Sequence, residues 1–299
     1  MDVQVFLFSF YSGESQVKIQ KAGKMFSAKI TRAANFKGAM QVLSATLSEC
    51  VFAVNEKGFT VSQLDSSNVC LVSMTYDIDD MQCPEPTHFA VNIELLVSCL
   101  KNLPNSGSIT IMRNKDSPEV ILKSDGTAIR STRFEVPGIA LDPPQNTLSE
   151  IKFEYGIEIP IAELQVIMAT AHTLDARNVL MRMTESDGKR YFSISATGKA
   201  SMLETFQGSA SDELLALGDG DVDPAAEAMQ APAQAKELMS DLYQVSYLLK
   251  FFRNVGNLVT VRFAPGVALI LSYELSPFGS SSSSVSFILA PSVSETMED

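Results

Sequence analysis

Apolar positions along the chain follow two alternating periods from residue 25 onward. One period places apolar residues three or four positions apart, as in amphipathic helices, and it covers the ranges 35–47, 92–103, 161–174 and 243–255. The other is an apolar–polar alternation in runs such as 59–64 and 69–76, which is typical of half-buried strands. We therefore expect four helices, each followed by strands.

The order of these segments divides the chain into two similar halves. Each half contains two units of a helix followed by strands, and the helical segment 92–103 aligns with the segment 243–255. A single helix cannot cover a sheet of this size, so two helices must share a core over antiparallel sheets. We predict an α+β fold with two similar domains, 25–139 and 151–299, joined by an interdomain connector at 140–150.

Two segments depart from this pattern. Residues 1–24 contain an apolar run at 3–10 without a basic leader or a small-residue cleavage site, so we interpret them as an extension outside the fold rather than a signal peptide. The range 211–234 combines Asp and Glu with Gly, Ala and Pro and is expected to be an acidic disordered insert. No apolar stretch approaches the roughly 18 residues of a membrane span.

The charge balance limits the ways in which the chain could bind nucleic acid. It has 23 Lys and Arg against 35 Asp and Glu, a formal net charge of −12. An overall basic field is therefore absent, which argues against a protein that simply coats DNA. A few basic residues gathered on one surface remain compatible with DNA binding.

The sequence offers little for catalysis or metal binding. The four cysteines, Cys50, Cys70, Cys83 and Cys99, have neither the spacing of a zinc site nor that of a disulfide framework, and buried free thiols are expected. Neither histidine lies in a nucleophile motif, and the chain has no Gly-rich phosphate loop. Asp65-Ser66-Ser67 lies between two predicted strands, where such residues usually form turns. We therefore expect no enzyme activity, cofactor or metal.

Several short segments, taken in order, resemble the proliferating cell nuclear antigen (PCNA) family of eukaryotic DNA sliding clamps. The segment 64–72, LDSSNVCLV, is similar to the family signature, and MFSAK at 25–29 resembles the family's first residues. Further similar segments lie at 90–101, 195–198, 247–252 and 288–291. The resemblance implies the DNA clamp fold, a homotrimeric ring with helices around the hole and sheets outside. It also implies a nuclear processivity factor that encircles duplex DNA without sequence specificity.

The resemblance implies DNA contacts on the helix faces that line the hole. The matching basic residues are Lys37, Lys101, His172, Lys250 and Arg253. Basic residues at these faces are fewer than the family usually carries, and Asn68 stands where the signature has histidine. An alternative therefore stays open, a checkpoint-type or specialised paralogous clamp subunit that acts as a signalling scaffold.

The family also binds short peptides of its partners, which include DNA polymerase, the clamp loader and other replication and repair proteins. Each peptide places a one-turn helix with apolar and aromatic anchors into a front-face pocket. The positions that match this pocket are Leu64, Asn68, Leu71, Leu148, Tyr247, Ala268, Ile288, Ala290 and Pro291. We expect Leu71 and Ile288 to present exposed apolar side chains beside loops, since partners use such patches. The strands 129–136 and 200–207 are expected to pair between neighbouring subunits.

Overall fold

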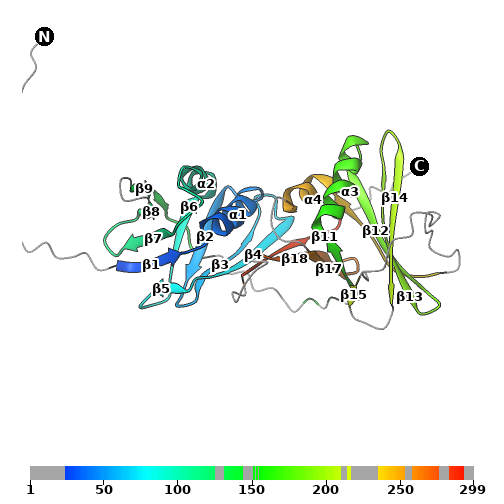
Figure 1. The fold of residues 1–299 in the computed structure, drawn as a ribbon. Helices are drawn as coiled ribbons and strands as arrows, with labels where there is room; N and C mark the ends of the chain where they lie inside the picture. The colour runs from blue at the N-terminus through cyan, green and yellow to red at the C-terminus, as the bar shows by residue number, and fades with distance from the viewer. Residues whose placement is uncertain are drawn as a thin grey trace, which may run out of the picture.

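The computed structural model describes residues 24–124, 131–143, 151, 153, 155–209, 214–216, 235–252, 258–275 and 283–292. The described residues form an α+β fold with a pair of helices over each half of the chain (Figure 1). The pair over the first half is α1 (Ala33–Ser44) and α2 (Ile93–Lys101), and the pair over the second is α3 (Ile161–Thr173) and α4 (Val245–Phe251). Figure 1 also shows the two halves side by side, with the strands at the centre of the molecule running beneath the helices.

The elements of the first half follow the predicted order closely. Its helices are α1 (Ala33–Ser44) and α2 (Ile93–Lys101). Its strands are β1 (Lys24–Ile30), β2 (Glu49–Val54), β3 (Gly58–Leu64), β4 (Cys70–Asp77), β5 (Asp80–Gln82), β6 (Thr87–Asn92), β7 (Ile109–Asn114), β8 (Val120–Ser124), β9 (Thr132–Val136) and β10 (Gly138–Ile139).

The second half repeats the arrangement. Its helices are α3 (Ile161–Thr173) and α4 (Val245–Phe251). Its strands are β11 (Tyr155–Pro160), β12 (Asn178–Ser186), β13 (Lys189–Thr197), β14 (Ser201–Ser209), β15 (Leu214–Ala216), β16 (Lys236–Gln244), β17 (Leu258–Ala264), β18 (Ala268–Glu274) and β19 (Ser284–Leu289).

Two expectations for the second half need correction. The fourth helix begins at Val245 rather than 243, because Tyr243 still pairs with Val179 of β12 as part of strand β16. Within the range expected to be a disordered insert, Leu214–Ala216 instead form β15, which pairs in parallel with β11. In both corrections the residues pair with a strand that is distant in the sequence, and the local sequence pattern does not reveal such pairing.

One continuous sheet joins the two halves. It has ten strands in the order β10-β6-β2-β3-β4-β19-β18-β17-β11-β15, and the halves meet where β4 pairs antiparallel with β19. A five-stranded sheet, β5-β1-β7-β8-β9, belongs to the first half, and a four-stranded sheet, β14-β13-β12-β16, belongs to the second. β9 and β14 are therefore edge strands of separate sheets.

The helices pack on one face of the central sheet through aromatic side chains. Phe36 of α1 contacts Tyr76 of β4 with ring centroids 5.2 Å apart, and Phe251 of α4 stacks on Phe287 of β19 at 4.2 Å. All four rings are almost fully buried, and each such burial is worth about 1.5–3 kcal/mol. This face is the core, so the opposite face of the same strands is the outer face of the sheet.

Candidate partner-peptide and DNA-binding surfaces

A row of apolar side chains crosses four neighbouring strands on the outer face. Leu64 of β3 pairs with Leu71 of β4, Leu71 pairs with Ile288 of β19, and Ile288 pairs with Ile270 of β18. We call these four residues the outer apolar row. Their neighbours in sequence, such as Val72 and Phe287, point to the core and are fully buried, as the alternation of side chains along a strand requires.

The next outward-facing row on the same strands is polar. It consists of Ser62, Ser73, Ser286 and Ser272. The hydroxyl oxygens of Ser272 and Ser286 lie 2.8 Å apart and share a hydrogen bond. The outer apolar row is therefore bounded by hydroxyl groups on one side, and a partner that covers apolar surface has a defined place to dock.

The four side chains of the outer apolar row differ in exposure. Leu64 is 39% exposed, Ile270 and Ile288 are half-buried, and Leu71 is only 6% exposed. The expectation that Leu71 presents an exposed side chain is therefore wrong. Leu71 forms the floor of the row, while Leu64 offers the most accessible apolar surface.

A tight turn between β3 and β4 lies at one end of this row. The carboxylate of Asp65 accepts hydrogen bonds from the backbone N–H groups of Val69 at 2.8 Å and Cys70 at 2.9 Å. Asn68 adopts a positive φ of 56° in this turn and is exposed. The turn interpretation of Asp65-Ser66-Ser67 is confirmed.

Tyr247 of α4 reaches across from the second half and completes the hydrogen bonding of this turn. Its hydroxyl donates to Asp65 Oδ2 at 2.6 Å. Burial raises the pKa of Asp65, but the hydrogen bonds from Tyr247 and from backbone N–H groups outweigh it, and the net pKa lies below its ordinary value. Tyr247 is 9% exposed, so its role here is to hold the turn in place.

The remaining expected pocket residues lie around the same end of the sheet. Ala290 is exposed and donates its N–H to the carbonyl of Val69 at 3.1 Å, Pro291 is half-buried, and Ala268 is buried. Leu148 lies outside the described residues. Sequence reasoning missed Ile270, because no motif marks it and only the strand register brings it to this row.

The comparisons with known proteins agree along the chain. Residues 25–142 match the family described as proliferating cell nuclear antigen, N-terminal domain. The chain is 23% identical over 275 residues to the DNA polymerase sliding clamp of Cenarchaeum symbiosum, covering 90% of this chain and 99% of that protein. It is 24% identical over 280 residues to the proliferating cell nuclear antigen of Chaetomium thermophilum, covering 91% and 99%.

Solved structures extend the similarity to the fold. The crystal structure of PCNA from Entamoeba histolytica superposes with a TM-score of 0.71 at 19% identity, covering 90% of this chain and all of that one. PCNA from Thermococcus kodakaraensis gives a TM-score of 0.69 at 18% identity, covering 89% and 100%. The chain is similar to PCNA clamps in sequence and in fold. The sequence-based resemblance and the α+β clamp fold are both confirmed.

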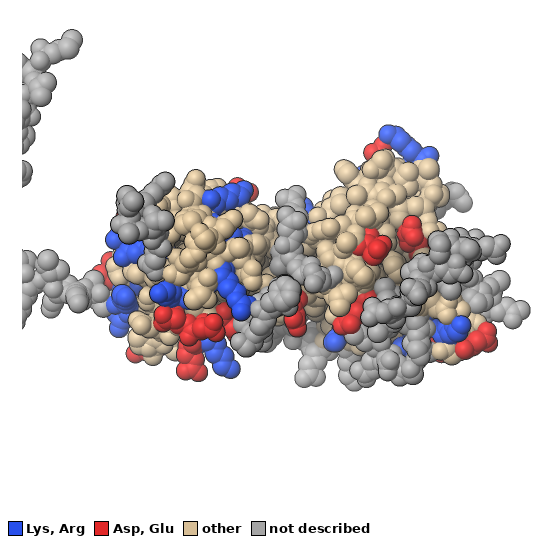
Figure 2. Space-filling model, viewed as in Figure 1, with Lys and Arg blue, Asp and Glu red and all other residues tan. Residues whose placement is uncertain are grey.

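Among the described residues, the helix layer exposes few of the cations expected to contact DNA. Lys101 and His172 are exposed, Lys250 is half-buried with its Nζ 5.0 Å from the ring centroid of Tyr247, and Arg253 lies outside the described residues. The same helices expose apolar side chains, namely Leu95 at 42% and Val166 at 65%. In the view of Figure 2, Lys and Arg are scattered over the described surface rather than gathered into one basic patch.

Lys37 does not belong with the accessible cations. It is 8% exposed, and its Nζ donates to the carbonyl of Leu103 and, at 2.7 Å, to Asn105 Oδ1. Burial lowers the pKa of this amine. The expectation that Lys37 contacts DNA therefore needs correction, since its amine ties α1 to the segment after α2.

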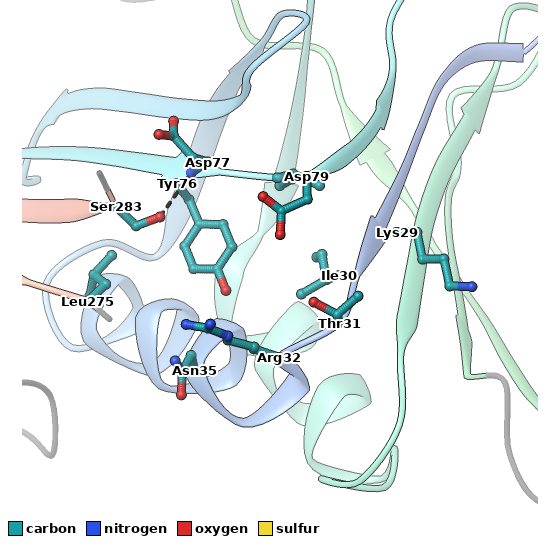
Figure 3. Close-up of a pocket in the computed structure, with 11 residues that line it drawn as sticks. Lys29, Ile30, Thr31, Arg32, Asn35, Tyr76, Asp77, Asp79, Leu275 and Ser283 are labelled. Atoms are coloured by element: carbon teal, nitrogen blue, oxygen red, sulfur yellow. Dashed lines mark hydrogen bonds between the residues drawn. The ribbon is translucent and has the colours of Figure 1, made fainter. Parts of the chain in front are cut away.

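A small cavity of about 40 Å³ lies where the two halves meet, with Arg32, Tyr76 and Asp79 among its lining residues (Figure 3). Ser283 of the second half accepts the N–H of Asp77 at its wall, at 3.0 Å. Burial raises the pKa of Tyr76 to about 12. Acidic and basic side chains both line the cavity, which is large enough for water, and this mixture favours neither a cation nor an anion.

All four cysteines are free; Cys50 and Cys70 are buried, whereas Cys83 and Cys99 are half-buried. Across the part of the chain that the structure describes, no group of three His, Cys, Asp or Glu could hold a metal ion. No helix within that same part is long and apolar enough to span a membrane.

Proposed function

We propose that this chain is a sliding clamp subunit that encircles duplex DNA and tethers a DNA polymerase and other partners, without catalysing a reaction itself. The observation that carries the proposal is the clamp fold over 90% of the chain, together with curated relatives that are named sliding clamp and PCNA. The mechanism is topological. A closed ring cannot dissociate from a duplex sideways, so weak and mobile phosphate contacts suffice. We propose a nuclear location with this role.

The edge strands support a ring of identical subunits. β9 and β14 lie at the edges of different sheets, and an uncovered edge is a template for pairing with another chain. Head-to-tail pairing of β9 with β14 of the next subunit would cover both edges, and rotation that closes at three subunits leaves none of them free. Leu203, 54% exposed on β14, would become covered in such a ring.

The helix layer favours a second candidate function. Leu95 and Val166 are exposed there, whereas Lys101, His172 and Lys250 are the described candidates for phosphate contacts. A surface of this kind would also suit a checkpoint-type or specialised paralogous subunit that works as a signalling scaffold. The mass in solution separates the candidates, because a trimer formed by the chain alone supports the replicative clamp and a stable monomer supports a hetero-oligomeric subunit.

A retention assay tests the topological mechanism directly. The chain is loaded onto a nicked circular plasmid by a clamp loader and isolated on a sizing column, before and after a restriction enzyme linearises the plasmid. Retention on the circle and loss from the linear form are expected, because a ring can slide off free ends. Equal retention on both forms would contradict the proposal.

A further inference from the structure

The extension before the clamp fold has an unusual composition for a segment outside a core. Val3-Gln4-Val5-Phe6-Leu7-Phe8-Ser9-Phe10-Tyr11 is almost entirely apolar or aromatic. Leu7, Phe10 and Tyr11 stand at positions i, i+3 and i+4, which meet on one face of a helical turn. An apolar segment of this kind is unfavourable in water and is stabilised by a surface that covers it.

The outer apolar row is suited to a helical occupant rather than an extended one. Its strands β3, β4, β19 and β18 are interior to the ten-stranded sheet, each with a paired neighbour on both sides. A docked segment therefore finds no free sheet edge and must satisfy its own backbone groups, as a helical turn does. The row spans three strand-to-strand steps, about 14 Å, which accommodates three anchor side chains from one turn.

The strand register shows that the extension can reach this row in its own chain. Met25 lies beside the start of β6, since the hydroxyl of Thr87 donates to its sulfur at 3.5 Å. Thr87 shares a cross-strand row with Tyr76 of β4. Leu71 lies three strands across and five residues along from there, about 22 Å away at ordinary strand dimensions. The residues from 12 to 23 can span about 40 Å, which leaves length for the chain to pass from the core-facing side of Thr87 to the outer face of the sheet.

We propose that residues 4–11 dock as a helical turn on the outer apolar row of the same chain, with Leu7, Phe10 and Tyr11 as anchors, and so compete with partner peptides. The inference rests on the proposed function of this row as the partner site. The extension is then an autoinhibitory segment that a partner must displace. A tether of this short length gives a local concentration in the millimolar range, so even a weak intramolecular contact fills the row.

A competition experiment with the full chain tests this proposal. The probe is a fluorescein-labelled synthetic peptide of residues 1–14, titrated by anisotropy against the wild type and the triple variant Leu7→Ala/Phe10→Ala/Tyr11→Ala. The variant is expected to bind the probe about tenfold more tightly. That factor follows from a millimolar local concentration and an intrinsic Kd of about 0.1 mM. Phe6→Ala/Phe8→Ala removes the same kind of side chain from the flanks of the turn and should bind as the wild type does.

Each other outcome overturns the proposal. Equal affinity of wild type and triple variant would mean that the extension leaves the row open. If Phe6→Ala/Phe8→Ala gained as much affinity for the probe as the triple variant, the overall apolarity of the extension, rather than the three anchors, would be what blocks the row. Failure of the probe to bind the triple variant, or binding that survives an added Leu64→Asp, would place the segment elsewhere. Retention of both variants on circular DNA is measured in parallel, so a failure of the clamp function is recognised separately.

Discussion

The hydroxyl of Tyr247 donates a hydrogen bond of 2.6 Å to Asp65 Oδ2 across the joint between the two halves of the chain. Asp65 belongs to the turn after β3, and Tyr247 belongs to α4, 182 residues later. The other carboxylate oxygen is occupied by two backbone N–H groups of the same turn. This contact fixes the end of the outer apolar row relative to the second half, so the geometry of that row depends on the joint.

Removing the hydroxyl of Tyr247 should destabilise the chain. Tyr247→Phe leaves the buried carboxylate of Asp65 with one hydrogen bond fewer, and hydrogen bonds to charged groups contribute about 1.5–3 kcal/mol. We expect a loss of that order in the free energy of unfolding, measured by urea denaturation. Tyr243→Phe is the matched control. Its buried hydroxyl has no hydrogen-bond partner among the described residues, so its removal should be neutral or slightly stabilising, and equal losses in both variants would refute the assignment.

The contribution of Asp65 should depend on pH. Its folded pKa lies below the ordinary value of 3.8, so the ionised carboxylate stabilises the fold at pH above that value. The stabilisation is lost as pH falls through the folded pKa. The difference in unfolding free energy between wild type and Asp65→Asn should therefore be largest near pH 7 and shrink below pH ~4. A difference that is constant down to pH ~3 would contradict this account.

The edge strand β14 should control assembly. Leu203→Glu places a charge where pairing with β9 of a neighbour would exclude water, and we expect light scattering to report monomers. Leu258→Glu is a matched control, because Leu258 is exposed to nearly the same extent, 53% against 54%, but lies on β17, which has paired neighbours on both sides. A trimer that survives Leu203→Glu would place the interface elsewhere.

Lysines on the helices should separate into two classes. Lys101→Ala and Lys250→Ala together should reduce the salt dependence of DNA retention by about one unit of slope per lost phosphate contact. Lys37→Met should leave that slope unchanged but lower the free energy of unfolding by about 1–3 kcal/mol, because it leaves the carbonyl of Leu103 without its donor. Retention measured between low and high salt, together with urea denaturation, distinguishes the classes. If Lys37→Met changed the salt dependence of retention by the same amount, Lys37 would have to be a DNA contact.

The outer apolar row should bind partner peptides through its exposed end. Leu64→Asp changes the most accessible side chain of the row and should abolish binding of a labelled clamp-binding peptide, while circular dichroism stays unchanged. Ser62→Asp adds the same charge on the adjacent polar row of the same strand and should reduce affinity by less than about threefold, since a charge at the rim contributes little. Equal losses in both variants would indicate a general electrostatic effect instead of a defined apolar site.

Much of the fold was predictable because it depends on local spacing. The helix over 161–173 and strands such as Gly58–Leu64 follow from which residues must be buried on one face. The start of the fourth helix was not predictable, because Tyr243 fits the spacing of apolar positions both in a helix and in a strand. Its pairing with Val179, 64 residues earlier, decided the matter.

The sequence by itself determined the repeated α+β architecture and the likeness to PCNA, since these follow from local patterns and short motifs. Only the tertiary structure decided that Lys37 is an internal donor, that Leu71 is a floor residue and that Ile270 completes the apolar row. The physical reason is the same in each case. Whether a side chain is free to act depends on neighbours that strand pairing and packing bring from elsewhere in the chain, and its own segment does not specify them.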